Sequence, residues 1–342
     1  MIDLLDDKVP CTIDFEKVES IDFSAMRMLL QHRQAGHAFY IANASDAVAA
    51  KFATTGIDKF ISVTGQPEEV NMDDYQQTGD GYTALSYSHK DGQQMIKLYY
   101  DFIPLEVVER EKRIATSALM LGIHTPMAGP IVRDGKRFGV SFERIANKKS
   151  FARAIADNPQ KLDYYAVTFA HICKKLHSTE CDTAVFPSIT DFYRALVARS
   201  PYYGDEMKAK ILAFVDSVEP HTTCIHGDLH IGNIITNGTD NLLIDMADFS
   251  YGNPWFDLGL VNLTANYISD EQISHLYHIT KDVYQKFWAI FVREYFGIST
   301  DAEVKEIENQ LKPFTALKML HFGELSKHLS DDFRQLIETV FG

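Results

Sequence analysis

The chain has 342 residues, 46% of them hydrophobic and 12% aromatic, which fits two domains or a bilobal enzyme with an appendage. Its formal net charge of −14 argues against a nucleic-acid partner, because phosphate contacts need a basic surface. No apolar run is long enough to cross a membrane, and the first residues, MIDLLDDKVP, lack the basic start of a secretory signal, so we expect a cytoplasmic protein.

The N-terminal part alternates predicted strands and helices. Apolar spacing predicts strands over Thr12–Val18, His37–Ala42 and Phe60–Val63, and helices over Ser24–Gln34 and Asp46–Thr55. The polar run that follows, TGQPEEVNMDDYQQTGDG, contains proline and glycine and is predicted to be a linker.

The next part predicts a small antiparallel sheet with one helix. Two alternating segments in YTALSYSHKDGQQMIKLYY flank Asp91-Gly92, which is typical of a β-hairpin. A helix is expected from about Leu105 to Leu121, followed by a second strand-turn-strand around Arg133-Asp134-Gly135. From Ser150 onward the pattern is mostly helical, but two polar runs interrupt it, CIHGDLHIGNII and NLLIDMADFSYGNPWFDLG.

The first of these runs could hold a metal if it were a strand. His226, Asp228 and His230 alternate, so an extended backbone would point all three to one face, as metal ligands need. Gly227 and Gly232 disfavour a regular strand, however, and a loop is the better prediction.

The second run favours a different chemistry. Leu242-Leu243-Ile244 reads as a buried strand that delivers Asp245 shortly after Asn233. A carboxylate and a carboxamide offer oxygen ligands, which suit Mg²⁺. Asp228 is then placed to accept a proton from a substrate hydroxyl, so the pattern predicts phosphoryl transfer.

Together the two runs resemble the catalytic core of the aminoglycoside phosphotransferase and choline kinase-like family, relatives of protein kinases. The resemblance rests on HGDLHxGN, an intervening hairpin, Ile-Asp with an apolar residue, and a closing Asp-Leu. It implies an α+β, bilobal protein-kinase-like fold with a small antiparallel β N-lobe over 75–146 and a mainly helical C-lobe over 147–342.

The resemblance also implies a role for each motif residue. Asp228 would be the catalytic base, while Asn233 and Asp245 would bind Mg²⁺. Asp257 and His226 would support the catalytic loop, and His230 receives no role.

Upstream, the family's fold needs a lysine on a hairpin strand for the nucleotide phosphates and a helix glutamate that orients it. Lys97 in MIKLYY and Glu111 in the following helix match these positions. Glu106 and Glu109 are alternatives to Glu111, since all three lie within two turns of one helix.

The rest of the nucleotide site is implied in the same way. Gly79 and Gly81 occupy the place of the loop that covers the phosphates, and Glu143 and Ile145 fall at the hinge whose backbone would bind adenine. The cofactors implied are ATP, or GTP, together with Mg²⁺.

The N-terminal part resembles the later half of a STAS domain, the fold of anti-sigma-factor antagonists. The resemblance rests on Ile21-Asp22-Phe23-Ser24-Ala25 and on TTGIDKFISV, and it implies a partial STAS-like α/β domain over 1–68. Ser24 falls on the position that is phosphorylated in regulatory members, although alanine follows it where the pattern has glycine. Asp22 or Ser24 would cap the helix that begins here.

These features predict an ATP- and Mg²⁺-dependent transfer of the γ-phosphate to a hydroxyl of a small molecule. The acidic net charge favours an amine-bearing or aminoglycoside-like acceptor. One alternative is a non-catalytic nucleotide-binding regulator whose STAS-like domain binds a protein partner or a second copy of the chain. Another is a kinase that acts on a protein, with Ser24 itself as one target.

Overall fold

The computed structural model describes residues 11–34, 39–59, 61, 63–65, 67–81, 83–92 and 94–342. The chain divides into two compact units, Met1–Lys112 with Ala128–Arg144, and Arg113–Met127 with Ile145–Gly342. Parts of two predicted strands, 37–42 and 60–63, lie outside the described residues.

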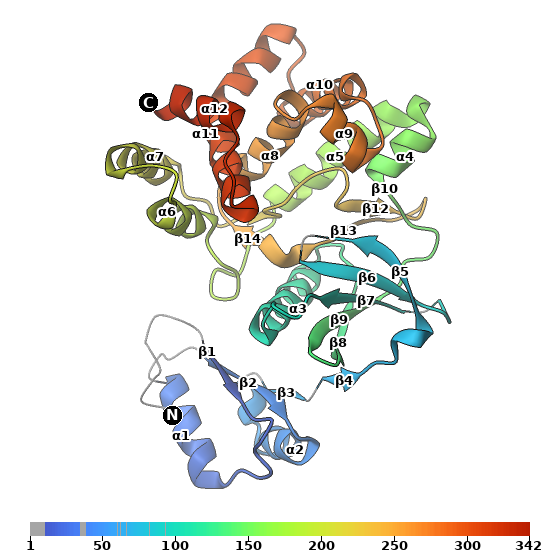
Figure 1. Cartoon of the computed structure of the whole chain (residues 1–342), viewed down its shortest axis with the longest axis vertical. Coiled ribbons are helices and arrows are strands. Elements are labelled where there is room, and N and C mark those ends of the chain that lie inside the picture. The colour runs from blue at the N-terminus through green and yellow to red at the C-terminus, as the bar shows by residue number, and fades with distance from the viewer. Residues whose placement is uncertain are drawn as a thin grey trace. The chain divides into compact units, whose positions relative to one another are not determined.

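The first unit begins with a three-stranded parallel sheet of order β1-β2-β3 (Figure 1). A helix connects each pair of neighbouring strands, as parallel pairing requires. The predicted alternation of strands and helices is confirmed, whereas the STAS resemblance stays a prediction. The elements are β1 (Cys11–Asp14), α1 (Phe23–Gln34), β2 (Phe39–Ala44), α2 (Asp46–Thr55) and β3 (Val63–Gly65).

This sheet has its own hydrophobic cluster. Met26 and Leu29 from α1 and Val48 and Phe52 from α2 pack together with the side chains of β2. Every buried member of this cluster lies between residues 15 and 61. The helices of this small layer thus bury their apolar faces within the same segment.

The prediction of a linker over the segment that follows was wrong. It contains β4 (Glu68–Glu69), the short 3₁₀ helix η3 (Met72–Asp74) and β5 (Tyr75–Asp80). β5 pairs with β6 at the edge of a sheet, and most of its side chains are exposed. A strand in that position has few apolar residues, so its sequence reads as a loop.

The second sheet of this unit has six strands in the order β4-β8-β9-β7-β6-β5. Both predicted hairpins are confirmed, and Gly92 in the first turn has a φ of 81°. Helix α3 lies beside this sheet (Figure 1). Its Val108 packs against buried side chains of the sheet. The elements are β6 (Ala84–His89), β7 (Gln94–Tyr99), α3 (Leu105–Met120), β8 (Ala128–Asp134) and β9 (Arg137–Glu143).

The second unit is mainly helical, as predicted. Its short strands form the β10-β12-β13 sheet and the β11-β14 pair, and these frame the two polar runs. The helices are α4 (Phe151–Asp157), α5 (Leu162–His177), α6 (Ile189–Arg199), α7 (Asp205–Ser217), α8 (Trp255–Asn266), α9 (Asp270–Tyr277), α10 (Lys281–Phe296), α11 (Asp301–Ser326) and α12 (Asp331–Phe341). The strands are β10 (Lys149–Ser150), β11 (Cys224–Ile225), β12 (Ile234–Thr236), β13 (Asn241–Leu243) and β14 (Ser250–Tyr251), and two 3₁₀ helices are η4 (Pro159–Lys161) and η5 (Met246–Asp248).

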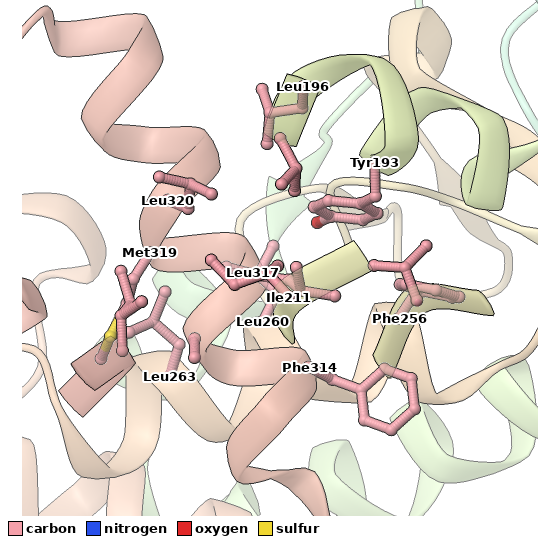
Figure 2. Close-up of a cluster of buried hydrophobic side chains, with 14 of the residues drawn as sticks. Tyr193, Leu196, Ile211, Phe256, Leu260, Leu263, Phe314, Leu317, Met319 and Leu320 are labelled. Atoms are coloured by element: carbon pink, nitrogen blue, oxygen red, sulfur yellow. The ribbon is translucent and has the colours of Figure 1, made fainter. Parts of the chain in front are cut away.

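Helices α8 and α11 pack against each other at the centre of this unit. A Cβ atom on Gly259 would lie 2.8 Å from the Phe314 backbone, so glycine allows this close approach. Thr315 joins the helices by accepting a 2.8 Å hydrogen bond from Asn262 Nδ2. Figure 2 shows the surrounding cluster, in which Tyr193, Leu196, Ile211, Phe256, Leu260, Leu263, Phe314, Leu317, Met319 and Leu320 are labelled.

None of the helices in the described ranges is both long enough and apolar enough to cross a membrane.

Candidate functional site

The loop between β11 and β12 is held in place by hydrogen bonds to Asp257. This carboxylate lies in the first turn of α8, is 1% exposed, and accepts hydrogen bonds of 2.7 Å from the amides of both His226 and Gly227. Gly227 has a φ of 81°, and a Cβ atom there would collide with the backbone of Asp248. Glycine is therefore required at this turn of the loop.

Asp228 lies on this loop with 29% of its side chain exposed. Asn233 Nδ2 donates to Asp228 Oδ2 at 3.1 Å and to the backbone oxygen of Asp228 at 2.9 Å. Burial alone would raise the pKa of Asp228, but the contact with His230 and the positive charge of Lys318 outweigh it and hold the pKa below its ordinary value. The residue is thus a carboxylate at neutral pH, and its exposed part can accept a hydrogen bond.

His226 joins the loop to the neighbouring strand. Its Nδ1 accepts from the Asp228 amide at 3.3 Å, so Nε2 carries the proton and donates to the Ile244 carbonyl at 3.0 Å. The Ile244 amide in turn donates to the Asn233 carbonyl at 2.9 Å. These bonds fix the residue that follows, Asp245, relative to the loop.

Asp245 has a left-handed backbone, with φ 62° and ψ 64°, and is exposed. This conformation costs a non-glycine residue about 1 kcal/mol, and such strain is concentrated at functional sites. Because Asn233 Nδ2 holds Asp228, the amide oxygen Oδ1 is the atom with which Asn233 can bind a metal. Among the described residues no group of three His, Cys, Asp or Glu side chains is arranged to hold a metal ion. One carboxylate and one amide oxygen nevertheless fit Mg²⁺, which takes much of its coordination from phosphates and water.

Asp248 lies close to these groups and was missed by the sequence analysis. Asp248 keeps an exposed surface, yet desolvation of its carboxyl group raises its pKa; the positive charge of Lys318 opposes this rise, and the negative charges of Asp228 and Asp245 add to it. The carboxylates of Asp228, Asp245 and Asp248 therefore repel one another and any further negative charge, and a bound cation would reduce this repulsion.

Lys97 and Glu111 form an ion pair in the first unit. Lys97 Nζ lies 2.8 Å from Glu111 Oε1, and the two side chains are 19% and 4% exposed. Glu106 is exposed on the same helix, and Glu109 is 6% exposed. This contact places Glu111, one of the three candidate glutamates, against Lys97. Its role in orienting the lysine for phosphate binding stays a prediction.

The remaining predicted nucleotide residues lie at element ends. Gly79 follows a shift in the pairing register of β5 with β6, and the Gly81 amide donates to the Ala84 carbonyl at 3.0 Å. Glu143 ends β9, and the boundary between the two units falls just before Ile145. That these residues bind a nucleotide stays a prediction.

Two distant helices contribute residues that the sequence analysis did not identify. His177, at the end of α5, contacts Asp257 Oδ2 through Nε2 at 3.1 Å and the Tyr295 hydroxyl through Nδ1 at 2.7 Å. Lys318 of α11 donates to the Gly227 carbonyl at 2.7 Å. The one available signal was a lysine inside the apolar run FTALKMLHF, where a surface residue is not expected.

Ser24 is exposed in the first turn of α1. Asp22 Oδ1 accepts from the Ala25 amide at 2.8 Å, so Asp22 caps the helix and leaves the Ser24 hydroxyl at the surface.

Comparison with known proteins places this geometry in context. The model of a family described as the phosphotransferase enzyme family matches residues 100–289. Methylthioribose kinase of Bacillus cereus is 35% identical over 86 residues, which are 24% of this chain and 22% of that protein. The same enzyme from another strain is 34% identical over 98 residues, 27% of this chain and 24% of that protein. The chain therefore matches less than a quarter of the length of these curated relatives.

Solved structures extend the likeness to the fold. A thermostable mutant of aminoglycoside phosphotransferase APH(4)-Ia in its apo form has a TM-score of 0.53 and 10% identity, covering 79% of this chain and 95% of that chain. A ternary complex of this protein with ADP and hygromycin B has a TM-score of 0.55, with the same identity and coverage. At this identity the likeness establishes a common fold, and the expected kinase-like architecture is confirmed.

Proposed function

Because the chain belongs to the phosphotransferase enzyme family, we propose that it transfers the γ-phosphate of ATP or GTP to a hydroxyl group of a small molecule. The observation that carries this proposal is the Asp228 carboxylate, partly exposed and held by Asn233 at 3.1 Å. In a kinase with a loose transition state, positioning of the hydroxyl and neutralisation of charge do most of the work.

In this proposal Asp228 accepts a hydrogen bond from the acceptor hydroxyl and orients its oxygen toward the γ-phosphorus. The hydroxyl oxygen forms the new P–O bond, the bond to the nucleoside diphosphate breaks, and the hydroxyl proton passes to Asp228. With its lowered pKa, Asp228 is a weak base, so the proton moves only as the new bond forms.

Asn233 Oδ1 and the Asp245 carboxylate would hold Mg²⁺, which when bound neutralises the charge of the phosphates. Lys97, oriented by Glu111, would hold the nucleotide phosphates in the first unit. Gly79, Gly81, Glu143 and Ile145 are the further residues that we propose to contact the nucleotide.

The acceptor is proposed only as a class, a small molecule with a hydroxyl group. Two kinds of relative suggest probes, namely methylthioribose from the curated kinases and hygromycin B from the solved complex. An amine-bearing acceptor, which the net charge favours, is a third class for the same screen. Consumption of Mg-ATP in the presence of each compound identifies the acceptor.

The catalytic assignment is tested by Asp228→Asn. We expect transfer to fall roughly 10²- to 10⁴-fold, because the proton acceptor is lost, while Mg-nucleotide binding measured by calorimetry is retained. Asp191→Asn, at an exposed carboxylate of α6, is the matched control and should keep full activity. Mg-ATP binding without turnover against any acceptor would instead favour a nucleotide-binding regulator.

We further propose that the N-terminal part, the partial STAS-like domain predicted over 1–68, is an accessory domain that binds a protein partner or a second copy of the chain. In support, Phe23 and Met28 of α1 are 66% and 42% exposed although the layer has its own core. Light scattering of the intact protein measures self-association, and mass spectrometry after incubation with Mg-ATP detects phosphate on Ser24. A protein that stays monomeric at all concentrations would refute self-association. The absence of phosphate on Ser24 would refute autophosphorylation.

A further inference from the structure

Lys318 is a buried lysine that reaches the catalytic loop from α11. Its side chain is 2% exposed, although it belongs to a residue type that is almost never fully buried without a partner. Nζ donates to the Gly227 carbonyl at 2.7 Å, lies 3.8 Å from Asp228 Oδ1, and lies 5.3 Å from the centre of the Phe322 ring. The charge is thus directed at one peptide unit of the loop and at the carboxylate that follows it.

The surroundings make this placement costly unless it serves the loop. Neighbouring residues of α11, among them Leu317, Met319 and Leu320, belong to the apolar cluster of the second unit (Figure 2). A leucine or methionine would extend that cluster without the cost of burying a charge, but it would leave the Gly227 carbonyl without its donor and Asp228 without the nearby positive charge. The contribution of this lysine is therefore made at the loop and not in the packing of the apolar cluster.

The contacts around Asp228 show what the lysine adds. Asn233 Nδ2 lies 3.1 Å from Oδ2, and His230 Nε2 lies 3.6 Å from the same oxygen. Lys318 Nζ approaches the other oxygen, Oδ1, at 3.8 Å. The carboxylate is therefore restrained from two sides, and the Gly227 carbonyl before it is restrained by the same Nζ atom.

We propose that Lys318 is a positioning residue that sets the orientation of the Gly227–Asp228 peptide and of the Asp228 carboxylate for the acceptor hydroxyl. Lys318 contacts neither phosphate nor acceptor in this scheme and acts through Asp228. The inference rests on the proposed phosphotransferase activity for its kinetic consequence, but its structural consequence is independent of that activity.

The first variant is Lys318→Met, which keeps the apolar stem and removes the charge and the donor. Lys318→Arg restores both, and Lys318→Gln keeps a donor without the charge. Thr315→Val is the matched control, since it removes buried hydrogen bonds between α11 and α8 one turn away without touching the loop. Each is made in the full chain.

The kinetic measurement uses Mg-ATP with methylthioribose, hygromycin B and an amino alcohol as acceptor probes. For Lys318→Met we expect kcat to fall roughly 100-fold with little change in the KM for Mg-ATP, because a misplaced catalytic group lowers the rate by about this factor. Lys318→Arg should recover at least part of the loss. Thr315→Val should unfold at a lower temperature but keep its kcat.

The second measurement is hydrogen exchange of the backbone amides in 226–233, followed by mass spectrometry. Lys318→Met should exchange roughly tenfold faster in this segment than the wild type, whereas Thr315→Val should not. If Lys318→Met does not fold, Lys318→Gln is measured in the same way.

The two measurements separate the possible failures. A wild type that transfers phosphate to none of the probes removes support for the proposed function, and exchange alone then decides the role of Lys318. If Lys318→Met keeps wild-type kcat, or keeps wild-type exchange in 226–233 while losing only thermal stability as Thr315→Val does, the lysine is structural and the inference is overturned.

Discussion

Replacing Asp257 by asparagine should destabilise the second unit strongly. The native carboxylate accepts from the amides of His226 and Gly227, both at 2.7 Å, and contacts His177 at 3.1 Å. Burial raises the pKa of Asp257, but the hydrogen bond and charge of His177 lower it more, so the group is ionised in the folded state. An asparagine of the same shape offers one oxygen and one NH₂ group, and the NH₂ group must face a backbone donor.

The expected loss can be estimated from these contacts. A hydrogen bond to a charged group contributes about 1.5–3 kcal/mol, and an unpaired buried donor costs about 1–3 kcal/mol. Asp257→Asn loses one backbone bond and weakens the other two contacts, so we expect the free energy of unfolding to fall by about 3–5 kcal/mol.

Urea unfolding followed by tryptophan fluorescence measures this loss. The two tryptophans, Trp255 and Trp288, lie in α8 and α10, so the signal reports on the second unit. Asp191→Asn, which removes an exposed carboxylate, should change the free energy by less than about 1 kcal/mol. An Asp257→Asn protein as stable as the control would refute the view that this carboxylate holds the loop.

Two further predictions concern stability. Burial, followed by the charge of Lys318, lowers the pKa of His321 to about 3, so below pH 6.5 the unfolded chain binds a proton that the folded chain does not. The folded state is therefore destabilised relative to the unfolded state as the pH falls below 6.5. Without this histidine, His321→Phe should show a decline in unfolding free energy between pH 6.5 and pH 5 that is smaller by about 2 kcal/mol in urea titrations. An unchanged decline would contradict the burial of a neutral ring. Gly227→Ala should lower the free energy of unfolding by about 1–3 kcal/mol more than Gly238→Ala. Both glycines have a positive φ, but only at Gly227 would a Cβ atom collide with the backbone of another residue. Equal melting temperatures of the two variants would show that the loop can shift.

The sequence was informative where a site is built from neighbouring residues. Asp228 and Asn233 are five residues apart in one glycine-punctuated run, and Asp245 follows directly after the next hairpin, so two neighbouring runs were enough to propose all three. The pairing of Lys97 with a glutamate of the following helix was also predictable, although spacing alone left three glutamates open. The contact at 2.8 Å supports Glu111.

The groups that support the site could not be located in the same way. His177 and Lys318 reach the loop from positions 80 residues before Asp257 and 91 residues after Gly227. Such contacts depend on how the helices of the second unit pack, and helical periodicity gives the buried face of a helix but not its partner. A histidine or lysine on the buried face therefore indicates that it makes a buried contact, but it does not indicate which residue it contacts.

The misassigned linker illustrates the opposite error. Segment 75–80 is polar because β5 is an exposed edge strand, and periodicity detects burial rather than hydrogen bonding. Its pairing with β6 is made by backbone groups, which the pattern of side chains does not reveal.

The support of the loop by distant helices has a consequence for protein engineering. A graft of segment 224–257 into another helical scaffold would carry Asp228 together with its internal hydrogen bonds and with Asp257. It would leave behind His177, which contacts Asp257, and Lys318, which donates to the Gly227 carbonyl. In a transplanted loop Asp257 would lose its contact with His177 and Asp228 would lose the charge of Lys318, so a designer would have to supply a new polar partner for each carboxylate.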